Sequence, residues 1–271
     1  MRKQEILVRF IKRLIRGALE HTSTGSRFLM RREYGVSGPH GHPDAPWTCA
    51  VLKSAEEVQE SFEQVQRLGL PSAPDRPKNW DSLAALDLIL RTTNTRSRIF
   101  DAGGEWYSVI LPWLCLYGYK NLTVGNLVFD KKIRRGTVVY EHSDITSTKF
   151  SNGSFDAVTC LSVIEHGVDL DAYFKEMSRI IRDGGILITS TDYYETPIDT
   201  KGQEAYGVPI HIFTRDEITQ ALELAARYGF SLMSPIELRS AEKVVHWKDY
   251  DLRYTFVIFS LLKASPPTAS A

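Results

Sequence analysis

From about residue 82 onward, short apolar segments alternate with segments long enough to form helices. The short apolar segments, which are typical of buried strands, cover residues 98–101, 121–126, 137–140, 155–160 and 185–190. This alternation predicts an α/β fold whose sheet is mostly parallel, because each parallel pair needs a crossover helix. Two further strands are expected at 231–238 and 253–263, which makes seven in all. No helix-length segment separates these two, so the last strand should run antiparallel.

Local signals mark several helix ends. The segment 169–181 has an apolar stripe at helical spacing, and the Asp-Gly-Gly at 183–185 is expected to end its helix. A Thr-x-x-Glu capping box predicts a helix over 215–228. Pro112 lies inside the apolar segment 106–118 and predicts a kink or a break there, because proline lacks a backbone N–H.

The first 80 residues lack this regularity. Residues 1–20 place apolar side chains on one helical face and basic ones elsewhere, which predicts a basic amphipathic helix. Residues 35–80 are rich in glycine and proline and predict a loop-rich cap with one helix near 54–68. The sequence thus divides into an N-terminal basic helix and loop-rich cap over 1–80, a second domain over 81–265 and a disordered tail over 266–271.

Charge is balanced overall but unevenly distributed. Lysine plus arginine and aspartate plus glutamate each total 33, so the chain lacks the basic footprint of a nucleic-acid-binding protein. Residues 1–35 nevertheless carry nine basic and three acidic side chains, a net charge of +6. Two interpretations of the basic helix therefore stay open. It makes weak contact with an anionic membrane or a partner, or it packs its stripe on its own domain.

Three cysteines, Cys49, Cys115 and Cys160, are too widely spaced to suggest a disulfide framework and favour a reducing compartment. No apolar run approaches the roughly 20 residues of a membrane-spanning helix. Charges interrupt every apolar stretch near the amino terminus, which argues against a signal peptide. We therefore expect a cytoplasmic protein. His40 and His42, with Cys49 beyond them, match no compact zinc pattern, so no metal is expected.

Chemistry-bearing residues gather first in RIFDAGGEWYSV, residues 98–109, where a predicted strand runs into Asp101, two glycines and Glu105. Ligands of open parallel sheets bind beyond the carboxyl ends of the strands. A dinucleotide dehydrogenase needs G-x-G-x-x-G there, and two carboxylates would repel a diphosphate. An NAD-dependent oxidoreductase is therefore disfavoured. A cationic ligand fits these charges better, and S-adenosylmethionine carries both a sulfonium and an ammonium.

Three segments together resemble the class I S-adenosylmethionine-dependent methyltransferases of the small-molecule, methyltransferase type 11-like kind. DAGGEWYS is similar to their first motif, D/E-x-G-x-G-x-S/G. The segment 140–167, YEHSDITSTKFSNGSFDAVTCLSVIEHG, resembles their third- and fourth-strand region, and 174–192, FKEMSRIIRDGGILITSTD, resembles their L-x-E-x-x-R-V-L-K-P-G-G segment. The resemblance covers about 98–192. It implies a doubly wound, Rossmann-like sheet, S-adenosylmethionine as cofactor and methyl transfer to a small-molecule or glycan hydroxyl.

The resemblance also implies cofactor-binding residues. Asp101 would order the methionine end of the cofactor, with the backbone of Ala102 and Gly103 against it. Asp144 would accept a hydrogen bond from the adenine amino group, and Ile145 would pack on the ring. Leu161 and Ser162 would line the pocket near the cofactor.

Two positions depart from the family pattern. Glu105 stands where the second glycine is expected, with Gly104 one place early. Asn126 ends the second predicted strand where an acid normally holds both ribose hydroxyls. Asparagine offers one acceptor and one donor group but loses charge-assisted strength. These departures leave open a degenerate fold that acts as a binding or scaffold subunit without catalysis.

A hydroxyl acceptor needs a base. His166 follows the fourth predicted strand and can take a proton near neutral pH, and His211 is the second candidate. Glu165 and Asp192 are too weakly basic unless burial raises their pKa values. Three tyrosines are candidates for the acceptor pocket: Tyr193, Tyr194 and Tyr206. Methylation of a nucleic-acid base is disfavoured, because LSVIEH replaces the N/D-P-P-Y/F signature.

Overall fold

The computed structural model describes residues 17–20, 22–240 and 242–265. The basic helix predicted over 1–20 and the tail predicted over 266–271 thus lie almost wholly outside the described residues. In the described part, helices occupy α2 (Ser23–Tyr34), α3 (Ala55–Arg67), α4 (Lys78–Thr92), α5 (Ile110–Leu116), α6 (Leu170–Ile180) and α7 (Arg215–Arg227), with a 3-10 turn η1 (Lys248–Tyr250).

Among the described residues, ten strands form the main sheet and two more form a separate hairpin. The main sheet contains β1 (Ala50–Val51), β2 (Arg98–Ala102), β3 (Asn121–Asn126), β4 (Ile133–Arg135), β5 (Val138–His142), β6 (Phe155–Leu161), β7 (Ile181–Tyr193), β10 (Phe230–Leu232), β11 (Val245–Trp247) and β12 (Leu252–Lys263). The hairpin pairs β8 (Glu204–Ala205) with β9 (Val208–Pro209). The strands β5-β3-β2-β6-β7 are parallel neighbours, as the alternating pattern predicts.

The last strand, β12, runs antiparallel to β7, which confirms its predicted direction. Its other edge is divided between two short strands. Val257 and Ile258 pair with β1, and Leu261 to Lys263 pair with β10. The seven predicted strands are thus all present, although β10 is shorter than the predicted 231–238. The structure adds β1, β4 and β11, which the sequence pattern does not indicate.

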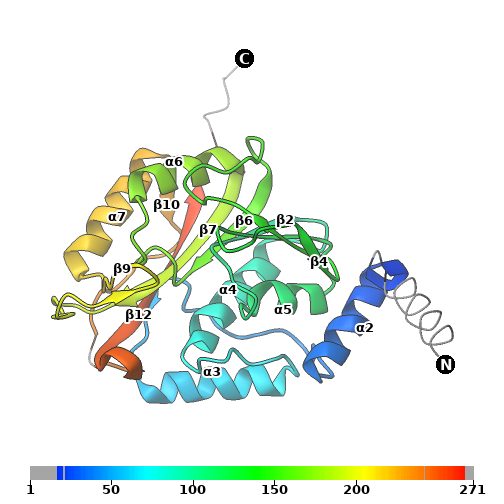
Figure 1. The fold of residues 1–271 in the computed structure, drawn as a ribbon, viewed down its shortest axis with the longest axis horizontal. Coiled ribbons are helices and arrows are strands. Elements are labelled where there is room, and N and C mark those ends of the chain that lie inside the picture. The colour runs from blue at the N-terminus through cyan, green and yellow to red at the C-terminus, as the bar shows by residue number, and fades with distance from the viewer. Residues whose placement is uncertain (1–16, 21, 241, 266–271) are drawn as a thin grey trace.

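Helices cover both faces of this sheet (Figure 1). Along β2, Ile99 belongs to the core shared with α3, α4 and α5, whereas the next residue, Phe100, belongs to the core shared with α6 and α7. Leu187 and its neighbour Ile188 divide between the same two cores. Side chains of a strand alternate between faces, so continuous apolar strands bury both faces of a doubly wound sheet.

Two predicted helix features are corrected. Helix α6 ends at Ile180 rather than at the Asp-Gly-Gly, because Ile181 is already extended and pairs with Phe155. The glycines instead lie in β7, next to a register shift in its pairing with β6. Helix α5 begins only at Ile110, so Pro112 occupies its first turn. Backbone N–H groups of a first turn have no partner within the helix, and the predicted kink or break is therefore absent.

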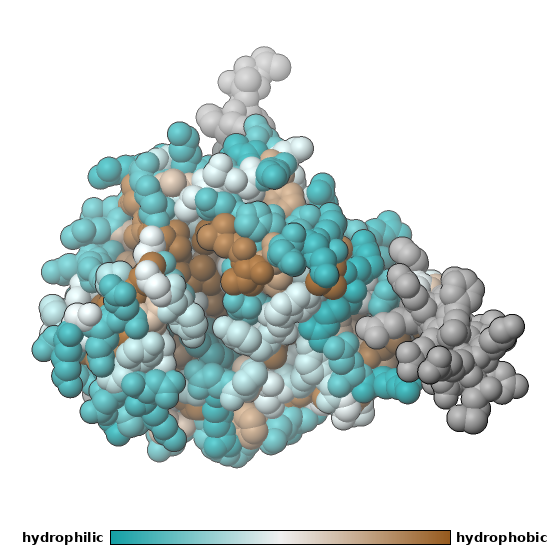
Figure 2. Space-filling view, in the orientation of Figure 1, coloured by the Kyte–Doolittle hydropathy of each residue, from teal (hydrophilic) through white to brown (hydrophobic). Residues whose placement is uncertain are grey.

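Described residues of α3 and α4 belong to the same core as the sheet. Helix α4 crosses the division placed at residue 80, and Trp80 and Leu83 are buried in the core shared with α3 and α5. Within the described residues no helix combines the length and the apolar character needed to cross a membrane. Cys49, Cys115 and Cys160 are all free thiols. On the face shown in Figure 2, apolar side chains gather near the middle of a mostly hydrophilic surface.

Candidate cofactor and acceptor site

A cavity of about 640 Å³ opens beyond the carboxyl ends of β2 and β6. The turn after β2, the loop after β6 and the first residues of α4 line it, together with residues from β11 and β12. Its volume is typical of a small-molecule pocket. The cavity lies where an open parallel sheet is expected to bind its ligand.

The turn after β2 requires both of its glycines. Gly103 has a φ of 85°, which side chains rarely allow, and its N–H donates to the carbonyl of Gly125 at 2.7 Å. A Cβ at Gly103 would overlap Val163, and a Cβ at Gly104 would overlap the carboxylate of Asp101. The turn therefore brings bare backbone and the Asp101 carboxylate to the cavity wall together.

Asp101 is 2% exposed, and only one of its carboxylate oxygens is satisfied. Oδ1 accepts a hydrogen bond from the Thr159 hydroxyl at 2.7 Å, whereas Oδ2 has no partner among the described residues. Burial raises the pKa of Asp101 to about 7, the Thr159 hydrogen bond opposes this, and repulsion from Asp81 adds to it. A buried, unpaired carboxylate oxygen that lines a cavity is a site for a cationic donor.

The two positions that depart from the family pattern also lie at this turn. Glu105 lines the cavity. Asn126 does not, because its amide group is used elsewhere: Nδ2 donates to the carbonyls of Gly103 and Gly104, at 2.7 and 3.2 Å. Its Oδ1 accepts from the Val128 N–H at 3.2 Å. Asn126 thus fixes the glycine turn, a contact that sequence analysis did not anticipate.

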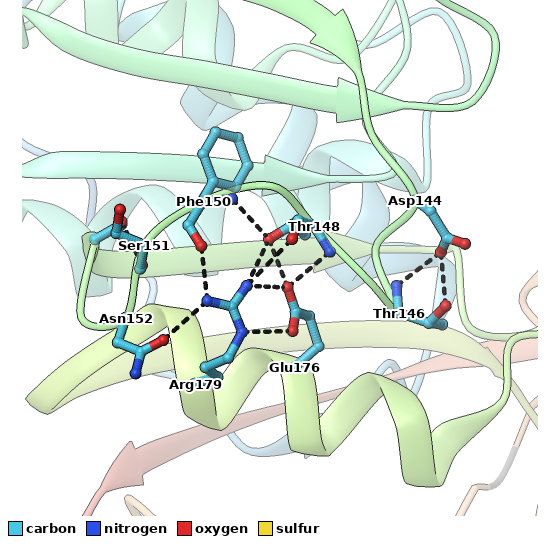
Figure 3. Close-up of polar contacts among 9 residues, drawn as sticks. Asp144, Thr146, Thr148, Phe150, Ser151, Asn152, Glu176 and Arg179 are labelled. Carbon is cyan, nitrogen blue, oxygen red and sulfur yellow. Dashed lines mark hydrogen bonds and ion pairs between the residues drawn. The ribbon is translucent and has the colours of Figure 1, made fainter.

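Asp144 and Ile145 follow β5 but do not line the cavity. Oδ1 of Asp144 accepts from the N–H and the hydroxyl of Thr146, at 2.8 and 2.7 Å, while Ile145 packs in the core. Figure 3 shows this aspartate at one end of a loop whose other end is held by α6. The role of Asp144 and Ile145 at an adenine ring stays a prediction.

The loop is held by one ion pair on α6 (Figure 3). The guanidinium of Arg179 donates to both carboxylate oxygens of Glu176, at 2.8 and 2.6 Å, and to the Phe150 carbonyl at 2.7 Å. Glu176 in turn accepts from the N–H and hydroxyl of Thr148. These charge-assisted bonds fix the loop from residue 148 to residue 152 against α6.

Beyond the glycine turn, the cavity wall includes a lysine side chain, Lys78, that the sequence pattern does not indicate. Ser162, just after Leu161 at the end of β6, has a left-handed φ of 54° and accepts a hydrogen bond from Lys78 Nζ. Both Leu161 and Ser162 line the cavity, as the resemblance implies. Lys78 Nζ also lies 3.8 Å from the centre of the Phe256 ring, which is the distance of a cation–π contact.

Around Lys78 lie three buried carboxyl groups, called here the carboxyl cluster: Asp81, Glu165 and Asp192. Asp81 accepts from the Ser190 hydroxyl at 2.6 Å, and Glu165 Oε2 accepts from the Thr191 hydroxyl at 2.9 Å. Glu165 Oε1 is buried without a partner among the described residues. The only signal in the sequence for Asp81 is an acid inside the apolar segment WDSLAALDLIL.

Electrostatics in this cluster favour bound protons. Burial and, to a smaller extent, the neighbouring Glu165 raise the pKa of Asp192 to about 7 against the opposing effect of Lys78. Burial also raises the pKa values of Asp81 and Glu165, again against the effect of Lys78. The cluster therefore binds protons more readily than ordinary carboxyl groups do, and a carboxyl group that holds a proton both donates and accepts hydrogen bonds.

Of the two candidate bases, the structure brings only His166 to the cavity. Its ring meets that of Tyr206 edge-on at 5.1 Å, and burial lowers its pKa, so its imidazole is neutral at pH 7. His211 does not line the cavity. Its Nε2 lies 3.3 Å from the Glu217 carboxylate, and its ring packs on Phe213.

The tyrosines divide in the same way. Tyr206 lines the cavity, whereas Tyr193 donates its hydroxyl to the Leu238 carbonyl and Tyr194 lies beneath the ammonium of Lys243. No group of three or more histidine, cysteine, aspartate or glutamate side chains in the described part of the chain is arranged to hold a metal ion.

Comparison with known proteins points to a methyltransferase domain. Residues 123–189 match the model of a family described as a methyltransferase domain. The match covers only part of the chain and supports the resemblance to class I, S-adenosylmethionine-dependent methyltransferases. It also supports the methyltransferase chemistry and the cofactor that the motifs imply. The unpaired Asp101 oxygen beside bare glycine backbone fits the cationic methionine end of that cofactor.

The similar proteins are distant. A sterol 24-C-methyltransferase of Aspergillus fumigatus is 24% identical over 110 residues, which cover 38% of this chain and 29% of the relative. The chain thus matches less than a third of that relative's length.

Two solved structures share the fold. A geranyl diphosphate C-methyltransferase of Streptomyces coelicolor is 15% identical with a TM-score of 0.51, over 88% of this chain and 98% of that one. An S-adenosylmethionine-dependent methyltransferase of Methanosarcina mazei is 14% identical with a TM-score of 0.50, over 66% and 98%. At such identities these similarities support the Rossmann-like fold.

Proposed function

We propose that the protein transfers the methyl group of S-adenosylmethionine to a hydroxyl oxygen of a small molecule. The observation that carries this proposal is the pairing, in one cavity, of the unsatisfied Asp101 carboxylate with the neutral imidazole of His166. The first suits the cationic end of the cofactor, and the second suits removal of a hydroxyl proton. Leu161 and Ser162 line the same cavity as Asp101 and His166.

When bound, S-adenosylmethionine supplies a methyl group on a sulfonium, which takes up the electron pair of the broken S–C bond as a C–O bond forms. Asp101 and the glycine turn hold the cofactor's methionine end in place. His166 takes the proton of the acceptor hydroxyl on a ring nitrogen, a contribution of about 10²–10⁴-fold in rate. Most of the remaining acceleration comes from holding the acceptor oxygen in line with the methyl group.

Asp192 is a second candidate base. An ordinary carboxylate is too weakly basic to take the proton of a hydroxyl group. Asp192 is a stronger base than an ordinary carboxylate, because its burial raises its pKa to about 7. The substitutions His166→Ala and Asp192→Asn distinguish the two candidates, because loss of the base lowers turnover without a matching loss of cofactor affinity.

The test begins with cofactor binding. Calorimetry should detect S-adenosylmethionine binding to the full chain, a large loss in Asp101→Ala and no loss in Glu223→Ala, which removes an exposed carboxylate on α7. Release of S-adenosylhomocysteine is then measured with a panel of sugar nucleotides, glycolipids and phenols. Absence of binding heat at millimolar cofactor, from folded protein, would refute the proposal.

A binding or scaffold subunit without catalysis is the second candidate function. The observation that favours it is Asn126, because hydrogen bonds within the chain already use both polar groups of its amide. Such a subunit would show no methyl transfer to any acceptor of the panel, even if it binds the cofactor.

A further inference from the structure

The entrance of the cavity is formed in part by the β8–β9 hairpin. Its two-residue loop is Tyr206-Gly207, and both residues have positive φ, 56° and 80°. Two-residue hairpin loops of this kind favour Asn-Gly, because asparagine tolerates the left-handed conformation better than other side chains. Tyrosine at this position costs of order 1–3 kcal/mol, and such strain is found where a side chain is needed for function.

The Tyr206 ring is exposed yet lies between other cavity residues. It is 79% exposed, meets His166 edge-on and faces Trp247 with ring centroids 6.5 Å apart and planes tilted by 25°. Trp247 comes from β11 and lines the cavity as well. These two nearly parallel rings, called here the aromatic pair, present flat apolar faces at the entrance.

Deeper in the cavity lies the carboxyl cluster with Lys78. Glu165 Oε1 is buried and has no partner among the described residues, which favours a ligand that brings a hydrogen-bond donor. Lys78 brings an ammonium donor to the same part of the cavity. A ligand that reaches this depth therefore needs polar groups that both donate and accept.

We infer that the acceptor is a neutral sugar ring, whose apolar face packs on Tyr206 and Trp247 while its hydroxyl groups bind Glu165, Asp192 and Lys78. This inference rests on the proposed function and names its substrate class. A sugar ring combines an apolar C–H face with several hydroxyl groups, each of which both donates and accepts. That combination matches an aromatic entrance above a polar interior.

Charge narrows the choice further. The burial that raises the pKa values of Asp81, Glu165 and Asp192 would also disfavour a phosphate or carboxylate group placed at this depth. An ammonium group would have to displace or approach Lys78. A neutral hydroxyl avoids both costs, and its oxygen can lie near His166 for deprotonation.

The test uses neutral methyl glycosides as probes of the full chain. Saturation-transfer NMR, in the presence of saturating S-adenosylhomocysteine, compares methyl glycosides of hexoses and 6-deoxyhexoses with a hexuronate, an amino sugar and a phenol. We expect binding of neutral glycosides, at least about tenfold weaker in Trp247→Ala. Phe28→Ala, which removes an exposed aromatic ring on α2, should bind as the wild type does.

Tyr206→Asn separates ligand binding from folding. Because asparagine suits this loop, the variant should unfold at the same or a higher urea concentration than the wild type, yet bind neutral glycosides at least about tenfold more weakly. Glycoside binding that survives Tyr206→Asn and Trp247→Ala would overturn the inference. So would binding of only the charged probes, only the phenol or no probe, while calorimetry still detects S-adenosylhomocysteine. Failure of S-adenosylhomocysteine to bind would instead refute the proposed function.

Discussion

Asp101→Asn tests the electrostatics of the cofactor site most directly. The carboxyl group is buried, and burial raises its pKa from the ordinary value of 3.8 to about 7. Between these pH values the unfolded chain has lost the proton that the folded chain keeps. Stability due to this group is therefore complete below about pH 4 and is lost as pH rises through 7.

The magnitude follows from the size of the shift. About three pKa units at about 1.4 kcal/mol each give a loss of about 4 kcal/mol in the free energy of unfolding between pH 4 and pH 7. Asp192, also raised to about 7, contributes in the same direction. Asparagine cannot ionise, and its Oδ1 can still accept the Thr159 hydrogen bond. The variant should thus lack only the pH-dependent change in the free energy of unfolding that Asp101 contributes.

Urea denaturation at pH 4, 5, 6, 7 and 8 measures this contribution. The free energy of unfolding of Asp101→Asn, minus that of the wild type, should increase by up to about 1.4 kcal/mol per pH unit between pH 4 and 7. Above pH 7 this difference should stay constant. Asp130→Asn, which changes an exposed carboxylate, serves as the control and should follow the wild-type profile. Parallel profiles for the wild type and Asp101→Asn would refute the assignment of a proton to Asp101.

Cofactor affinity should also depend on the ionisation of Asp101, but it should rise with pH where the free energy of unfolding falls. The cationic end of S-adenosylmethionine favours the ionised carboxylate, so binding below pH 7 must expel a proton. Wild-type affinity should then rise by up to about tenfold per pH unit up to about pH 7, whereas Asp101→Asn should bind weakly with a flat profile. A flat wild-type profile would show that the cofactor does not contact this carboxylate.

Three other predictions concern His166, Asn126 and the N-terminal segment. His166→Ala should lower turnover by about 10²-fold or more while cofactor affinity in calorimetry stays within a few-fold, and a collapse of affinity would contradict the base role. Asn126→Ala removes both donors to the glycine turn and should weaken S-adenosylmethionine binding by about tenfold, whereas Asn152→Ala, away from the cavity, should not. Anionic-lipid vesicles should retain the full chain at low salt and release it at high salt, and equal retention of a chain that begins at residue 36 would exclude membrane contact by residues 1–20.

The sequence predicted the central sheet because its strands are fully buried. A strand such as β2, covered by helices on both faces, is buried along most of its length and therefore mostly apolar, and the helices between such strands impose parallel neighbours. Short edge strands such as β4 lack this signal, because half-buried residues in a three-residue segment have no distinctive pattern. The same limit applies to β1, which depends on pairing with β12, some 200 residues later.

Site residues were predictable where a motif fixes the local backbone. Asp101 and its glycines combine a strand end, a positive φ and a carboxylate within a few residues, so their place in the cavity follows from local sequence. Lys78 and Asp81 are different. They lie on a helix that carries no methyltransferase motif, and only the tertiary packing of α4 brings them to residues that follow β6 and lie near the end of β7. Their chemistry could not be inferred from spacing.

The cavity is therefore one electrostatic unit rather than two adjacent sites. Asp81 helps to raise the pKa of Asp101, and Lys78 acts on Asp81, Glu165 and Asp192 together. A cation that neutralises Asp101 thus also reduces the repulsion felt by Asp81. Because these groups are buried, their interactions are little screened by water or salt. The protonation state near the acceptor hydroxyl accordingly depends on whether the cofactor end of the cavity is filled.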